Sequence, residues 1–98
     1  QSVVREAGLI KKANPDAQVE VVVYGQALDL LVKDKSAYAD DIEKLVNNKV
    51  EFKACHIAMD HHQITESQLI PGVGTVPDGI YEIIKKQREG WGYIKVAF

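Results

Sequence analysis

The stretch from Lys49 to Met59, KVEFKACHIAM, decides the fold of this chain and holds its single cysteine. Every second residue from Val50 to Ala54 is apolar, and this period of two predicts a strand with one face buried in the core. The apolar run stops at His56, which places Cys55 at the carboxyl end of the strand. Ligands of open α/β sheets bind beyond the carboxyl ends of the strands, and the amino end of a helix following Cys55 would favour its thiolate form. We therefore predict that the chemistry of this chain is centred on Cys55.

Length and composition fit one compact domain. The 98 residues are 46% hydrophobic and 27% charged with a net charge of −2, which is ordinary for a globular protein and gives no basic excess for binding nucleic acid. The sequence shows neither an apolar run of the ~20 residues that a membrane span needs nor a signal segment. One cysteine excludes an internal disulfide and is compatible with a reducing compartment. We expect one soluble, cytoplasmic domain over residues 1–98, without a cofactor and without a nucleic-acid or membrane partner.

The first half of the chain predicts a helix followed by a buried strand. Residues from Ser2 to Lys12 have an amphipathic helical pattern, with the lysines of the last turn open to water, and the turn at Asn14 to Asp16 ends it. Gln18 to Tyr24 is apolar on both faces, interrupted only by Glu20, as expected for a central parallel strand covered by helices. Ala27 to Val32 then predicts one or two helical turns.

Helices and strands continue to alternate in the second half. Ser36 is predicted to cap a helix that ends at Asn47-Asn48, before the strand that leads to Cys55. The elements predicted after Cys55 are a short helix from Ile57, a capping box at Thr65 to Gln68, a brief strand at Gly74 to Pro77, a helix capped by Asp78 and ended by Gly90, and a closing strand from Trp91 to Phe98. This alternation predicts a parallel, three-layer α/β/α sandwich.

Three stretches carry a resemblance to a known family: VEFKAC, which ends at Cys55, the run LIPGVGTVPDGIYEIIKKQREGWGYIKV, and more weakly VEVVVYGQALDLLVKD. Together they resemble the DsrE/DsrF-like family of small sulfur-relay proteins. The resemblance implies four or five mostly parallel strands, assembly into trimers or hexamers, and a cysteine that carries sulfur as a persulfide. Cys55 is the position that matches that cysteine.

The chain departs from the family pattern in two places. Family members have a strand before the first helix, whereas this chain begins inside or just before that helix. The sheet is therefore one strand smaller, or residues precede Gln1. The second departure is His56 with the cluster Asp60-His61-His62, which is not part of the pattern.

Each candidate site residue has a plainer alternative. Cys55 is either a nucleophilic persulfide carrier or a buried apolar thiol. His56 is either an assisting base beside it or an ordinary surface histidine. Zinc is a further alternative, since Cys55, His56, His61 and His62 lie close in sequence. However, neither Cys-x-x-Cys nor His-x-x-x-His is present, so we predict no metal site.

We predict a sulfurtransferase-like relay protein in which Cys55 accepts a sulfane sulfur from a donor protein and passes it to another thiol. The alternative is a non-catalytic oligomeric or small-ligand-binding module in which Cys55 only lines the crevice. Self-assembly is expected because the tail from Trp91 to Phe98 is rich in apolar side chains, and a neighbouring subunit would cover them. The family resemblance implies that the assembly is a homotrimer or homohexamer. Trp91 and Tyr93 are the side chains that we place at that interface.

Overall fold

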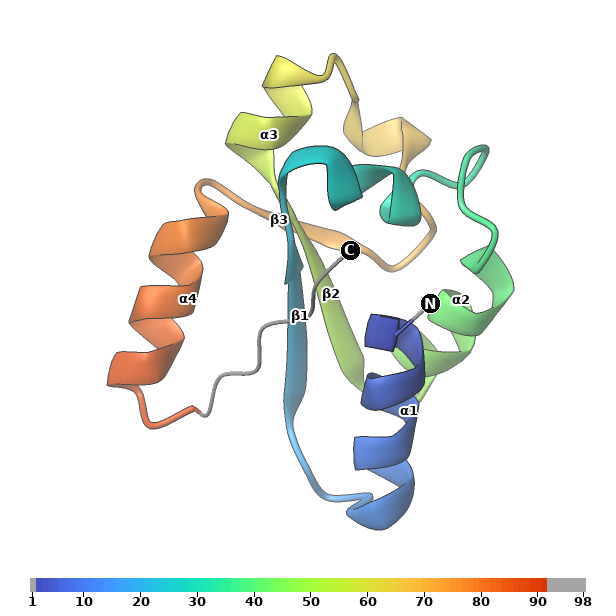
Figure 1. Cartoon of the computed structure of the whole chain (residues 1–98), viewed down its shortest axis with the longest axis vertical. Coiled ribbons are helices and arrows are strands. Elements are labelled where there is room, and N and C mark those ends of the chain that lie inside the picture. Colours follow the sequence, from blue (N-terminus) through green and yellow to red (C-terminus); the bar gives the residue numbers. More distant parts are fainter. Residues whose placement is uncertain (1, 92–98) are drawn as a thin grey trace.

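The structure is a computed structural model that describes residues 2–91, and these residues form a parallel sheet between two layers of helices (Figure 1). The strands, in their spatial order, are β1 (Val19–Val23), β2 (Val50–Cys55) and β3 (Gly74–Val76). The helices are α1 (Ser2–Ala13), the 3-10 helix η1 (Gly25–Leu31), α2 (Ala39–Asn47), α3 (His56–His61), the 3-10 helix η2 (Glu66–Gln68) and α4 (Gly79–Arg88). The predicted α/β fold with a parallel sheet is confirmed.

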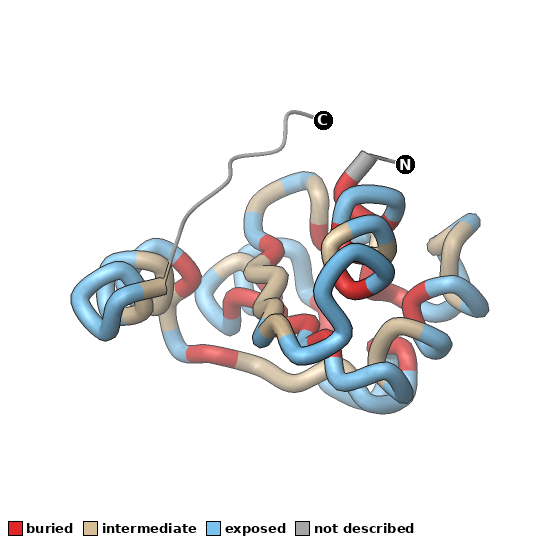
Figure 2. The backbone as a smooth tube through the Cα atoms, turned by 90° about the horizontal axis from the view of Figure 1, so that it is seen from below, coloured by how far each residue is buried: buried red, intermediate tan, exposed pale blue. Residues whose placement is uncertain are grey.

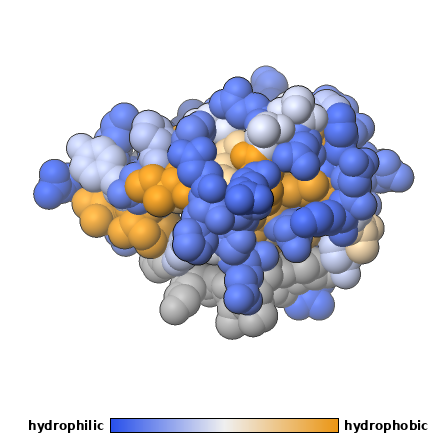
Figure 3. Space-filling view, turned by 90° about the horizontal axis from the view of Figure 1, so that it is seen from above, coloured by the Kyte–Doolittle hydropathy of each residue, from blue (hydrophilic) through white to orange (hydrophobic). Residues whose placement is uncertain are grey.

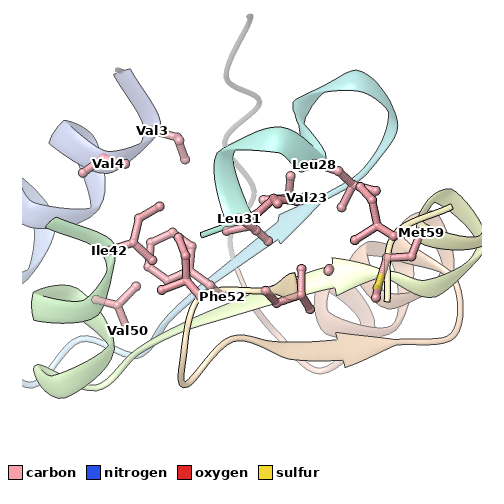
Figure 4. Close-up of a cluster of buried hydrophobic side chains, with 14 of the residues drawn as sticks. Val3, Val4, Val23, Leu28, Leu31, Ile42, Val50, Phe52 and Met59 are labelled. Atoms are coloured by element: carbon pink, nitrogen blue, oxygen red, sulfur yellow. The ribbon is translucent and has the colours of Figure 1, made fainter. Parts of the chain in front are cut away.

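One face of the sheet carries the hydrophobic core, beneath α1, α2 and η1. Parallel register places Val21 of β1 beside Phe52 of β2, and Val23 beside Ala54. The core side chains point toward one another from both sides of this layer (Figure 4). The largest of those that are less than 2% exposed are Phe52, Leu28, Leu31, Ile42, Met59, Ile70 and Val50. The alternating apolar residues of the strand that ends at Cys55 therefore face the core, as predicted.

The other face of the sheet is covered by α4. It carries Glu20 and Val22 from β1, which pair in register with Glu51 and Lys53 of β2. Cys55 ends β2 on this same face. Most residues of α4 are exposed or half-buried, in contrast to the buried positions of α1 (Figure 2). This layer is more polar than the core layer.

Two local predictions are corrected by side-chain hydrogen bonds. Ser36 does not cap α2, which begins at Ala39; its Oγ instead accepts the N–H of Tyr38 at 3.1 Å in a local turn. Lys11 is not open to water but 5% exposed. Its Nζ donates to the carbonyl oxygens of Pro15 and Ala17, both at 2.9 Å, and so ties α1 to the start of β1.

Other local predictions are confirmed. Thr65 and Gln68 form the predicted capping box, and the Asp78 side chain caps α4. Residues 2–91 supply three strands. The closing strand predicted from Trp91 to Phe98 lies outside the described residues apart from Trp91. No helix in this described part of the chain is both long and apolar enough to cross a bilayer.

Candidate functional site

Cys55 lies under the first residue of α4. Its side chain is 5% exposed, and its Sγ accepts a hydrogen bond from the backbone N–H of Gly79 at 3.2 Å. An N–H at the amino end of a helix carries partial positive charge, which stabilises negative charge on a sulfur atom. The geometry therefore suits a sulfur that carries negative charge.

Each backbone N–H group in the first turn of α4 has a hydrogen-bond acceptor. Asp78 Oδ1 accepts from Ile80 at 3.0 Å and Tyr81 at 3.4 Å, and the Asp78 carbonyl accepts from Glu82 at 3.0 Å. The N–H of Gly79 is left for Cys55. Since a helix begins with N–H groups that have no partner inside the helix, the cap and the cysteine together satisfy this end.

Glycine at position 79 permits this close approach. A Cβ atom there would lie 3.2 Å from Cys55 Cβ, 3.2 Å from Val22 Cγ1 and 3.6 Å from Cys55 Sγ. Any larger residue would push the helix away from the sheet or displace these two side chains. The Val76-Pro77-Asp78-Gly79 segment thus brings the amino end of α4 onto the thiol.

The prediction that the next helix in the sequence would direct its amino end at the thiol is wrong. That helix, α3, has six residues; Cys55 occupies its N-cap position without a side-chain cap hydrogen bond. The side chain of Cys55 points to the α4 face of the sheet, because strand residues alternate between faces. Helix α4, 24 residues further along, supplies the N–H group.

The structure places the histidines on the surface. His56 is exposed, and its Nδ1 lies 3.4 Å from Asp60 Oδ2, one helical turn away. His61 and His62 contact each other edge to face, with ring centroids 5.3 Å apart. Within residues 2–91 no three His, Cys, Asp or Glu side chains converge as metal ligands. An assisting role for His56 remains a prediction, and the carboxyl group beside its ring in the structure is that of Asp60.

A hollow of about 410 Å³ lies at the opposite end of the strands from Cys55. It is lined by residues at the starts of β1 and β2 together with Lys11 and Trp91, and its charged side chains are those of Lys11, Asp16, Lys49 and Glu51. It is separated from the thiol by the length of β2, so it contributes nothing to the site at Cys55.

Glu20 is a residue whose role the sequence reading missed. Its side chain is 4% exposed, between the sheet and α4, with Oε2 3.7 Å from the Nζ of Lys86. Burial first, and then the neighbouring carboxyl of Glu82, raise the pKa of Glu20 to about 7. In the sequence, the signal for such a role was that Glu20 is the one charged residue in the otherwise apolar strand β1. Sequence alone does not show which side chains meet it.

The fold and the site define a class: an α/β/α protein with a thiol at the end of a parallel strand, beneath the amino end of a helix. The model of the DsrE/DsrF-like family matches residues 3–96, and this chain belongs to that family. A search among curated proteins finds no match.

The fold is also found in a solved structure, described as that of the protein of unknown function MTH1491 from Methanobacterium thermoautotrophicum. The two chains share 29% sequence identity with a TM-score of 0.83, over 94% of this chain and 85% of the other.

Proposed function

We propose that this chain is a sulfur-relay protein that carries a sulfane sulfur as a persulfide on Cys55. The observation that supports the proposal is the hydrogen bond from Gly79 N–H to Cys55 Sγ at the start of the ten-residue helix α4. Membership of the DsrE/DsrF-like family supports it independently.

The proposed reaction has two exchanges. In loading, the Cys55 thiolate attacks the outer sulfur of a donor persulfide, a new S–S bond forms on Cys55, and the donor's S–S bond breaks to release the donor as a thiolate. In discharge, an acceptor thiolate attacks the outer sulfur on Cys55. The S–S bond to Cys55 breaks, the acceptor becomes the persulfide, and Cys55 returns to the thiolate. Sulfane sulfur and its proton move together, and no external oxidant is needed.

The Gly79 N–H serves both exchanges in the same way. Negative charge is on Cys55 Sγ before loading and returns to it on discharge. A fixed donor at the amino end of α4 stabilises that charge without reorganising in each step. Gly79 is thus a positioning residue of the proposed carrier, acting through its backbone.

Burial of Cys55 is the observation that favours the alternative function. A thiol that is 5% exposed is also what a wall residue of a non-catalytic binding module would present. In the carrier, the donor reaches Sγ only when the start of α4 moves away from β2.

Loading can be tested by intact-mass measurement after exposure to a low-molecular-weight persulfide donor. We expect an adduct of about 32 Da on Cys55 that a thiol reductant removes. The Cys55→Ser variant keeps a small side chain under Gly79 and should fold without accepting sulfur. If the wild-type chain gains no adduct while an established carrier loads beside it, the binding module is the better account.

We further propose that the chain assembles with copies of itself as a trimer or hexamer. Ile80, Tyr81 and Ile84 of α4 are 50%, 63% and 44% exposed, and apolar side chains gather on the α4 side in Figure 3, which views the end where the strands finish. Glu82 lies in the first turn of α4 and basic residues lie in its last, so two copies of the helix match when antiparallel, which is the contact expected across a two-fold axis between the trimers of a hexamer. Light scattering at micromolar concentration should give a multiple of the 10.9 kDa chain mass, and Ile84→Lys should lower it. A monomer mass that persists on concentration contradicts the assembly.

A further inference from the structure

A carboxyl group is buried between the sheet and α4 without a hydrogen-bond partner for one of its oxygens. The Glu20 side chain is 4% exposed, and its Oε1 makes no hydrogen bond in the described part of the chain. A carboxylate in such a place loses its hydration without full compensation. A proton on this carboxyl, or on one beside it, would supply the missing donor.

The charged groups that face Glu20 come from α4 and β2. Lys86 Nζ lies 3.7 Å from Glu20 Oε2, 4.0 Å from Glu82 Oε2 and 3.9 Å from Glu89 Oε1. From β2, Glu51 is the register partner of Glu20. All three Lys86 distances exceed the 2.7–3.2 Å of a direct N–H···O hydrogen bond. One ammonium group therefore stands among three carboxyl groups of α4 and β1 without satisfying Oε1.

The other cation on this face of the sheet does not serve Glu20. Lys53 of β2 extends its side chain over Gly74 of β3, where Nζ would be 2.9 Å from a Cβ at that position. Lys86 also lies 4.7 Å from the ring centroid of Trp91. Among residues 2–91, Lys86 is thus the cation that balances the carboxyl pair of Glu20 and Glu82.

A proton shared by this pair explains how the cluster is stable. Burial, a hydrogen bond with Glu82 in the protonated form, and repulsion from Glu82 raise the pKa of Glu20 from 4.5 to about 7, while Lys86 lowers it and Glu51 raises it. With the proton present, one carboxylate faces one ammonium. Once it is lost, two carboxylates face each other across the gap between β1 and α4.

We propose that Glu20, Glu82 and Lys86 form a proton-dependent latch that positions α4 over Cys55. Two members of the latch, Glu82 and Lys86, lie in α4, and the first residue of the same helix, Gly79, covers the thiol. Loss of the shared proton weakens the attachment of α4 to β1, so the start of the helix leaves Cys55 more often. Opening of the latch would increase the access of sulfur donors to Cys55 near neutral pH. This biological use rests on the proposed function.

Hydrogen exchange of the intact chain tests the latch without any sulfur chemistry. After correction for intrinsic exchange, opening of α4 should increase about tenfold between about pH 6 and about pH 8, while exchange of β2 stays unchanged. Alkylation of Cys55 by iodoacetamide, divided by the rate for the unfolded chain at the same pH, should rise in parallel.

One variant removes the titrating group, one removes its neighbour and one serves as a control. Glu20→Gln should reduce the change in α4 opening to less than about threefold. Glu82→Gln leaves Glu20 buried and should reduce the change by a smaller amount, and Glu43→Gln, on the exposed surface of α2, should leave it as in the wild type. The latch is overturned if α4 opens equally at both pH values, if both glutamine variants keep the full change, or if β2 loses protection together with α4. A functioning latch with no sulfur adduct on Cys55 would reject the proposed carrier alone.

Discussion

The two faces of the sheet show different uses of the same three strands. Beneath α1, α2 and η1, alternate residues of β1 and β2 are apolar: Val50, Phe52 and Ala54 of β2 are buried, as is Val23 of β1, and Phe52 at the centre is 1% exposed. Beneath α4, the same strands carry Glu20, Glu51, Lys53 and Cys55, and the helix contributes Lys86 and a glycine at its contact with the thiol. The core face supplies apolar burial, whose free energy favours the fold. The α4 face instead holds charged side chains and the free thiol of Cys55.

The largest expected effect is on the core face. Phe52→Ala removes a ring that is 1% exposed, and it should lower the free energy of unfolding by about 3–5 kcal/mol. Cys55→Ala on the other face should cost only about 1 kcal/mol. Urea unfolding of both variants measures the difference, and equal losses would mean that the two layers contribute alike.

The next effect is a dependence of stability on pH that comes from the α4 face. Glu20 has a pKa of about 7 in the folded chain against an ordinary 4.5, so the folded state holds a proton that the unfolded state releases. Its contribution is therefore lost as pH rises through this window, by about 2 kcal/mol between about pH 5 and about pH 8. Glu20→Gln should flatten this slope and leave the chain more stable than the wild type at the higher pH.

Urea titrations at several pH values measure this slope, with Glu43→Gln as the matched control on the opposite layer. All other groups are common to the two glutamine variants, so the difference between them isolates Glu20. A wild-type slope retained in Glu20→Gln would contradict the assignment.

The smallest expected effect on stability comes from the cap of α4. Asp78→Ala removes the acceptor of two N–H groups and should cost about 1 kcal/mol. Because the frayed turn is the one over Cys55, alkylation of the folded chain should become faster. Asp40→Ala, in the first turn of α2 but not at its cap, should change neither quantity as much. A drop in stability with an unchanged alkylation rate would show that the first turn does not control the thiol.

Periodicity in the sequence was enough to predict the core face. The alternation from Val50 to Ala54 depends on neighbours within one strand, and its apolar side chains Val50, Phe52 and Ala54 are all buried in the core. The cap at Asp78 was likewise predictable, since a cap acts within a few residues of its own helix.

The α4 face was not predictable in the same way. The contact between Cys55 and Gly79 joins residues 24 positions apart, and the sequence suggested the adjacent helix instead. Likewise, the sequence shows Glu20 as a charged residue in an apolar strand, but its proximity to Glu82 and Lys86 depends on how α4 crosses the sheet. These contacts depend on the tertiary packing of α4 against the sheet, which the spacing of residues within one element does not predict.

The most direct test of the account is discharge of sulfur from a loaded chain to a second thiol. Cys55 would be loaded with isotopically labelled sulfane sulfur, freed of donor, and mixed with a small acceptor thiol whose persulfide can be trapped and counted. The account predicts that the label leaves Cys55 and appears as acceptor persulfide in equal amount, with the Cys55 thiol restored and ready for a second round. Label that stays on the chain, or that leaves only as free sulfide without acceptor persulfide, would contradict a relay function for Cys55.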